Sequence, residues 1–221
     1  MVQKRELLKE QLQLINFLIE VFDDLSVLRR HKPENIERTV EELGDKEVRL
    51  LWRKYRRDAE KIIYFPLTIP RVRTLIKLRM LFQFLMPLGL IYVIMVIGFI
   101  WHPQMFPPPL SNIINFNFMI VAIVITTISG FGIIFADFFT RRTIIKKEIE
   151  SEKKLAVYQE RMKEATQQLI YIAKRKLAKL KNVKMVLELY HDDYKDVRLV
   201  EERRVRSLIF PRKFKIYIYE L

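Results

Sequence analysis

Side chains that could perform covalent or metal chemistry are few in this sequence and far apart. The chain has no cysteine, which excludes thiolate catalysis, disulfides and cysteine-ligated metal sites. His31, His102 and His191 are too distant from one another in the sequence to form a zinc-binding helical motif, and no serine has a neighbouring base. Glu188, His191 and Asp192 could together ligate one ion, but this segment is typical of a surface turn. We therefore expect no catalytic residue, no metal and no cofactor, and we predict that the protein is not an enzyme.

Asp137 is the one charged residue between positions 80 and 139. An acid within a membrane-spanning segment is a functional candidate by default, because a charge in lipid is costly. Asp137 lies at the end of its apolar run, however, and Arg141 follows four residues later, one helical turn away. We expect an Asp137–Arg141 ion pair, with an ion path or an inter-subunit contact as the alternative.

Small residues recur at every fourth position before this acid, at Ala122, Thr126 and Gly130. The spacing places them on one face of a helix, where small side chains let the backbone of another helix approach closely. We expect this face to make the packing contact of the segment that carries it.

Two long apolar segments must position these residues, namely Met80–Trp101 and Ile113–Ala136. Neither contains a charge, and each is long enough to cross a hydrocarbon core of about 30 Å as a helix. The pattern predicts a transmembrane helical hairpin, with spans at 80–101 and 113–139 and a short outer loop at 102–112.

Cations flank the predicted hairpin on its outer sides, whereas the loop between the spans has no formal charge. Because positive residues favour the cytoplasmic side, we expect both termini in the cytoplasm and the loop outside. The same cations are expected to contact anionic lipid headgroups or another polyanion. They are Arg71, Arg73, Lys77, Arg79, Arg141, Arg142, Lys146 and Lys147.

The first arm, residues 1–64, has the apolar periodicity of three helices. The first covers 3–30 and has an apolar face too wide for a single solvated helix, so it must pack against another element. Pro33 breaks the chain, and Gly44–Asp45 is typical of a helix stop followed by a new cap. A basic elbow with two prolines, residues 65–79, leads into the first span.

The second arm begins with a long predicted helix over 140–182, whose apolar seam includes Leu155, Met162 and Leu169. Because neither glycine nor proline occurs between Gly132 and Pro211, we expect this helix to continue the second span without a break. The basic segment 183–221 alternates apolar and polar residues near its end and predicts a small β element, with a further helix over 197–208 as the alternative.

The predicted fold class is therefore an all-α membrane protein, a two-span hairpin with long cytoplasmic, coiled-coil-like helical arms and a small C-terminal β element. We interpret the chain as a non-enzymatic, membrane-anchored scaffold or assembly subunit whose arms bind copies of itself or a partner. One alternative is an oligomeric channel or transport subunit in which the second span lines a pore. Another is a membrane docking factor for the ribosome or a nucleic acid, which the basic residues would bind but which no recognised RNA-binding motif supports.

Overall fold

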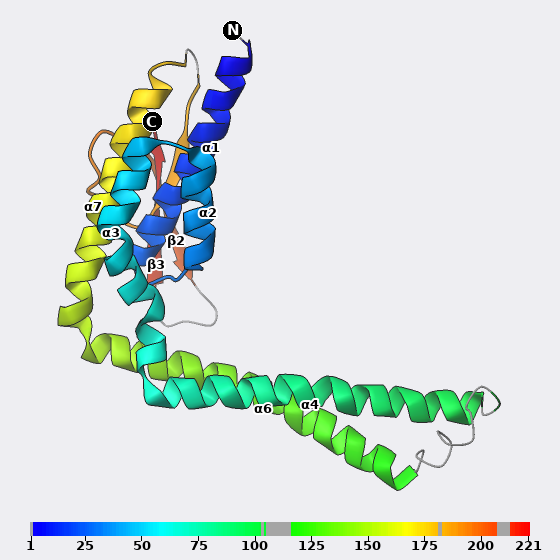
Figure 1. Ribbon diagram of the computed structural model, residues 1–221. Coiled ribbons are helices and arrows are strands. Elements are labelled where there is room, and N and C mark those ends of the chain that lie inside the picture. Colours follow the sequence, from blue (N-terminus) through cyan, green and yellow to red (C-terminus); the bar gives the residue numbers. More distant parts are fainter. Residues whose placement is uncertain (1, 103, 105–115, 181–182, 207–212) are drawn as a thin grey trace. The chain divides into compact units, whose positions relative to one another are not determined.

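A computed structural model describes residues 2–102, 104, 116–180, 183–206 and 213–221 (Figure 1). The chain divides into two compact units, one made of Met1–Phe65 with Ser151–Leu221 and the other of Pro66–Glu150. We call the first the arm unit and the second the hairpin unit. The fold is mostly helical, with two helices long and apolar enough to span a membrane and a small three-stranded sheet.

Four helices and the sheet make up the arm unit. The helices are α1 (Val2–Ser26), α2 (Pro33–Leu43), α3 (Lys46–Tyr64) and α7 (Glu152–Leu177). Helix α1 contacts the other three helices and strand β1, so it is the central element of the unit (Figure 1). Its wide apolar face accounts for this position, because residues on both of its apolar rows, such as Ile15 and Leu18, are fully buried.

The corner between α2 and α3 forms as the sequence predicts. Gly44 ends α2 with a left-handed backbone (φ 65°), and its N–H donates to the Glu41 carbonyl. Asp45 then caps α3, its carboxylate accepting hydrogen bonds from the backbone N–H of Glu47 at 2.8 Å and of Val48 at 3.4 Å.

The prediction of one unbroken helix from the second span into the second arm is wrong. Helix α6 (Phe116–Glu150) ends before Ser151, whose backbone (φ −107°, ψ 14°) departs from helical geometry, and α7 begins at Glu152. Serine is a weak helix former, and Ser151 precedes α7 without a capping hydrogen bond from its side chain. The second arm therefore starts with a separate helix, which ends at Leu177.

The C-terminal segment forms a sheet of strands β1 (Val186–Leu189), β2 (Arg198–Arg206) and β3 (Lys213–Glu220). The strand order is β1-β3-β2, with both neighbours antiparallel to β3. The predicted β element is confirmed, and the alternative helix over 197–208 is wrong because most of that stretch is β2. The sheet contributes Leu187, Leu189, Tyr217 and Tyr219 to the same core as α1.

The hairpin unit consists of helices α4 (Pro70–Trp101) and α6, preceded by the short 3-10 turn η1 (Phe65–Thr68). The two long helices lie side by side and antiparallel (Figure 1). Helix α4 starts at Pro70, a residue suited to the first helical turn, so the basic residues of the predicted elbow lie on its first turns. Apart from His102 and Gln104, the predicted outer loop and the start of the second span lie outside the described residues.

Candidate functional site

The two apolar helices approach most closely where Gly89 of α4 meets Ala122 and Thr126 of α6. A Cβ atom added at Gly89 would lie 2.9 Å from the Ala122 carbonyl oxygen and closer still to the Thr126 hydroxyl. The Thr126 hydroxyl donates a hydrogen bond to the Ala122 carbonyl at 2.8 Å, which satisfies its donor within its own helix. Two of the three predicted small residues therefore lie at the contact between the spans, where only glycine fits opposite them.

The third predicted residue, Gly130, lies away from this contact, because a Cβ atom there would have no neighbour within 4 Å. Between Thr126 and Asp137 the buried positions of α6 are instead Ser129 and Ala136, and a side chain at Gly132 would overlap the ring of Phe82. The contact stripe thus combines steps of four and three, which is the spacing that keeps one face of a helix against an antiparallel neighbour. Residues that repeat at every fourth position move progressively off that face of the helix.

Asp137 is ion-paired with Arg79, its Oδ1 lying 3.0 Å from the Arg79 Nη1. This pair joins α6 to α4, at the end of the hairpin that carries the flanking cations. Spacing along one helix could not reveal Arg79 as a partner, because the two residues are far apart in the sequence. The Asp137–Arg141 pair that the spacing suggested stays a prediction.

The flanking cations are exposed. The Arg73 guanidinium donates to the Leu67 carbonyl, and Lys147 pairs with Glu150 at 2.5 Å. All eight predicted contact residues, Arg71, Arg73, Lys77, Arg79, Arg141, Arg142, Lys146 and Lys147, are exposed side chains of the hairpin unit. Their contact with anionic lipid headgroups or another polyanion stays a prediction.

The three residues of the predicted arm seam are buried. Met162 and Leu169 of α7 belong to one core cluster with apolar residues of α1 and α3. Leu155 is 3% exposed and lies outside that cluster. The apolar faces of the two arms therefore cover each other within the chain. Met162 and Leu169 are not exposed to a second chain.

A buried polar cluster, which the sequence did not suggest, joins the end of α1 to the sheet; we call it the polar joint. Asp23 is fully buried and accepts hydrogen bonds from the Tyr194 hydroxyl at 2.6 Å and from the backbone N–H of Tyr190 at 2.5 Å. Ser26, also buried, lies 2.7 Å from His191 Nε2. The joint therefore connects residues more than 160 positions apart.

Ser26 and His191 lie as close together as a catalytic serine–histidine pair. The directions of their hydrogen bonds, however, differ from those of such a pair. The Ser26 hydroxyl donates its one hydrogen to the Asp23 carbonyl at 2.5 Å, so His191 Nε2 must donate to Ser26 Oγ. An imidazole nitrogen that carries a proton cannot take one from the hydroxyl. Ser26 is also only 2% exposed, which leaves no approach for a substrate. This arrangement holds the end of α1 to the segment that follows β1.

Burial controls the charge states of the joint. It raises the pKa of Asp23 to about 7, although the Tyr194 and Tyr190 donors favour the ionised carboxylate. Burial also lowers the pKa of His191, and the nearby Lys163 cation acts in the same direction. His191 is therefore neutral at neutral pH, consistent with its role as a donor to Ser26.

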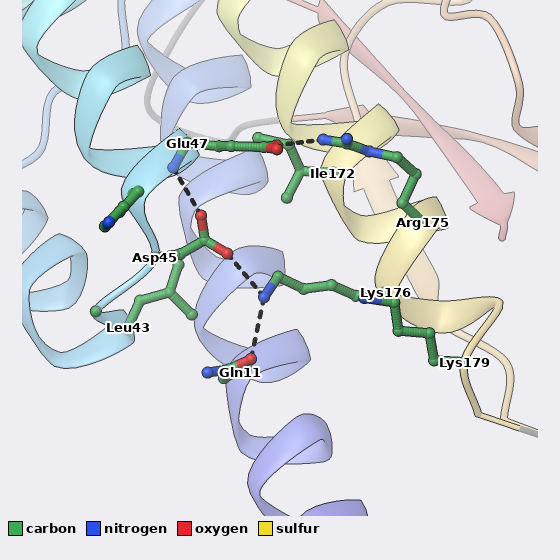
Figure 2. Close-up of a pocket in the computed structure, with 10 residues that line it drawn as sticks. Gln11, Leu43, Asp45, Glu47, Ile172, Arg175, Lys176 and Lys179 are labelled. Atoms are coloured by element: carbon green, nitrogen blue, oxygen red, sulfur yellow. Dashed lines mark hydrogen bonds and ion pairs between the residues drawn. The ribbon is translucent and has the colours of Figure 1, made fainter.

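An open pocket of about 670 Å³ lies among α1, the α2–α3 corner and α7 (Figure 2). The Lys176 ammonium reaches across it to the Asp45 carboxylate at 2.8 Å and the Gln11 side-chain oxygen at 3.0 Å, and Arg175 pairs with Glu47. Both acids that line this pocket are thus used in tying helices to one another. Among the described residues, no group of three or more His, Cys, Asp or Glu side chains could hold a metal ion, so Glu188, His191 and Asp192 do not form one.

Gly89→Ala is expected to weaken the hairpin, because the added methyl group overlaps a backbone carbonyl that cannot move without shifting α6. The loss should be about 1–3 kcal/mol, measured as a lower midpoint in thermal unfolding of the full chain in detergent micelles. Gly130→Ala is the matched control: its methyl group enters open space, so the midpoint should stay or rise slightly. Equal midpoints for the two variants would contradict the assigned contact.

The stability of the arm unit should depend on pH through Asp23. Because its pKa is raised from 3.8 to about 7, the folded chain binds this proton more tightly than the unfolded chain. Stability from this group is therefore fully present below about pH 4 and falls as the pH rises to about 7. Relative to Asp23→Asn, the wild type should lose on the order of 4 kcal/mol over this range, measured by urea unfolding at several pH values.

Tyr194→Phe removes a donor to the Asp23 carboxylate, so it should move the pH window upward. Parallel pH profiles for the wild type and Asp23→Asn would show that Asp23 does not titrate in this range.

The chain matches no protein-family model, no curated protein and no solved structure. Its function must therefore be inferred from the geometry and charge of its own residues.

Proposed function

We propose that this protein is an integral membrane protein in which the hairpin unit is the anchor and the arm unit is a non-enzymatic module for assembly. The observation that carries the anchor is the outward surface of α4 and α6. It is almost wholly apolar, and large side chains such as Phe84 (65% exposed) and Ile134 (65% exposed) project from it. A contiguous apolar surface of this size is unfavourable in water and is what a lipid-facing helix requires.

The composition of the arm unit supports a two-span topology. Its core combines α1–α3, which precede the hairpin, with α7 and the sheet, which follow it. Both halves must therefore lie on the same side of the membrane, and an even number of crossings satisfies this requirement. The exposed cations that flank the hairpin favour the cytoplasm as the side on which the arm unit lies. There they can bind anionic lipid headgroups.

An assembly role is supported by the way the arm unit uses its polar groups. The buried carboxylate Asp23, the hydroxyl of Ser26 and the pocket acid Asp45 are all bound by partners within the unit. Such groups stabilise the fold and leave the outer surface of the unit as the part that can recognise something else. A folded, basic module held at a membrane is suited to binding another copy or a partner protein.

A pore lined by the second span is less well supported. Thr126 and Thr127 donate to carbonyl oxygens of their own helix, and Asp137 is neutralised by Arg79. None of these groups presents an unpaired polar atom to a conduction path. Ribosome or nucleic-acid binding draws support from the exposed arginines alone, and it predicts an affinity that falls steeply with salt.

Topology can be tested cleanly because the chain has no native cysteine. Single cysteines placed at Lys32, His102 and Lys195 should react differently with a membrane-impermeant maleimide. We expect His102→Cys to react in intact cells and the two arm variants to react only after permeabilisation. Labelling of Lys32→Cys and Lys195→Cys from opposite sides would rule out the hairpin.

Assembly can be tested on the full chain in lipid nanodiscs, by light scattering and chemical crosslinking. We expect a complex larger than the monomer at micromolar concentration, either of copies or with a co-purifying protein. A strictly monomeric chain without a bound protein at every concentration would contradict the assembly role.

A further inference from the structure

The outward side of helix α3 carries a row of cations that no described residue neutralises (Figure 1). The helical period places them on one side of α3, within an arc of about 100°. All of these side chains are exposed, and none has an ion pair or a hydrogen bond to another described residue. They are Lys46, Arg49, Arg53 and Arg57.

Neighbouring acids are used elsewhere. The one acid on the same side of α3, Glu60, is bound by Arg56 at 2.8 Å, and Arg56 also binds Glu37 of α2 at 2.8 Å. The three arginines of the row follow one another at steps of four, so like charges lie one helical turn apart and destabilise the helix. A row of this kind, without a partner in the fold, is typical of a surface that binds something anionic.

Two large apolar side chains are exposed on the same side of α3. Leu50 (63%) lies among the cations, and Tyr64 (43%) lies at the end of the helix. The aromatic residues between the arginines, Trp52 and Tyr55, are buried (5% and 2%), so they are not available to stack on the bases of a nucleic acid. We use the term α3 face for the exposed set Lys46, Arg49, Leu50, Arg53, Arg57 and Tyr64.

Among anionic surfaces, the bilayer in which the chain is anchored fits the α3 face best. Every cation close to an anionic leaflet is attracted to it, whereas an exposed ion pair with another protein contributes little. Leucine and tyrosine side chains are stable in the headgroup region, but a nucleic-acid backbone offers them no apolar contact. Because the segment 65–69 joins α3 directly to α4, the chain itself keeps this leaflet at a high effective concentration.

We propose that the α3 face docks on the headgroups of the anionic leaflet, so that the arm unit lies against the membrane surface. This inference rests on the proposed role of the hairpin unit as the anchor, and it adds a second membrane contact made by the arm unit. The attraction acts between exposed charges, so docking weakens as the salt concentration rises. Lipid composition and salt therefore control how much of the arm surface is open to a partner.

A spin label on Leu50→Cys reports docking of the full chain in lipid nanodiscs. When the nanodiscs contain phosphatidylglycerol, we expect few collisions between the label and an uncharged, water-soluble nickel chelate. In nanodiscs of phosphatidylcholine alone, the collisions should be frequent, because the cations then have no anionic surface to bind. Added salt should restore frequent collisions in the phosphatidylglycerol nanodiscs.

Removal of the arginines tests whether the row causes this protection. Each cation should change the docking equilibrium by about fivefold, so Arg49→Gln, Arg53→Gln and Arg57→Gln together should weaken docking on the order of 100-fold. The collisions in phosphatidylglycerol should then rise to the level in phosphatidylcholine. The matched control removes the same charge from exposed lysines elsewhere on the arm unit, Lys9→Gln, Lys179→Gln and Lys195→Gln. This control should leave the collisions few.

Frequent collisions at residue 50 in both lipids, or protection that survives loss of the three arginines, would overturn the docking. A second label at Ile94, on the outward surface of α4, separates this outcome from failure of the anchor. If Ile94 is in lipid while residue 50 is in water, only the docking fails, and if both are in water, the anchor fails as well. Protection of residue 50 by poly(U) RNA and not by phosphatidylglycerol would assign the α3 face to a nucleic acid and overturn the lipid assignment.

Discussion

The outward surfaces of α4 and α6 carry large exposed apolar side chains, and the proposed membrane architecture follows from that constraint. These helices pack against each other along one narrow stripe, where Gly89 lets the backbone of α6 approach. The rest of their circumference carries large exposed apolar side chains. In lipid the same surface would be stable, because helices bond most of their backbone groups internally, although Pro87 of α4 has no N–H to donate. In the proposed topology, two such helices bring the chain back to the side on which it began.

That return allows the two ends of the chain to fold together. The first three helices cannot bury their wide apolar faces alone, and the segments after the hairpin supply α7 and a sheet to cover them. Buried polar contacts then define how these parts fit, with Asp23 and Ser26 of α1 bound by the tyrosines and histidine near the sheet. The apolar seams that the sequence offered as surfaces for a partner are buried within one chain. Among the described residues, the charged side chains of the edge strand β2 and the cations that flank the hairpin stay exposed.

Local patterns in the sequence predicted much of this fold, and long-range pairings were out of their reach. The apolar runs, the Gly44–Asp45 corner and the period of two in β3 each depend on neighbouring residues, so periodicity and turn chemistry suffice to predict them. Ser151 was missed because a single unfavourable helix residue is a weak signal beside a long helical pattern. Gly130 was placed at the contact because a step of four was extended, whereas the next contact residue, Ser129, follows Thr126 by three. The Arg79–Asp137 pair and the polar joint depend on tertiary contact, which no local pattern reports. Asp23 and Ser26 did carry one signal of burial in the sequence. Asp23 follows the buried Ile19 by one helical turn, and Ser26 follows the buried Phe22 in the same way.

The most direct measurement of the central claim is the environment of the hairpin surface in a bilayer. Spin labels on single cysteines at Ile94 and Ile134, both outward-facing, can be compared with labels at the seam residue Ala122 and the arm residue Lys32. Insertion predicts frequent collisions with oxygen and few with a water-soluble nickel chelate at 94 and 134, few collisions with either at 122, and frequent nickel collisions at 32. Frequent nickel collisions at 94 and 134 would place the hairpin in water and contradict its role as a membrane anchor.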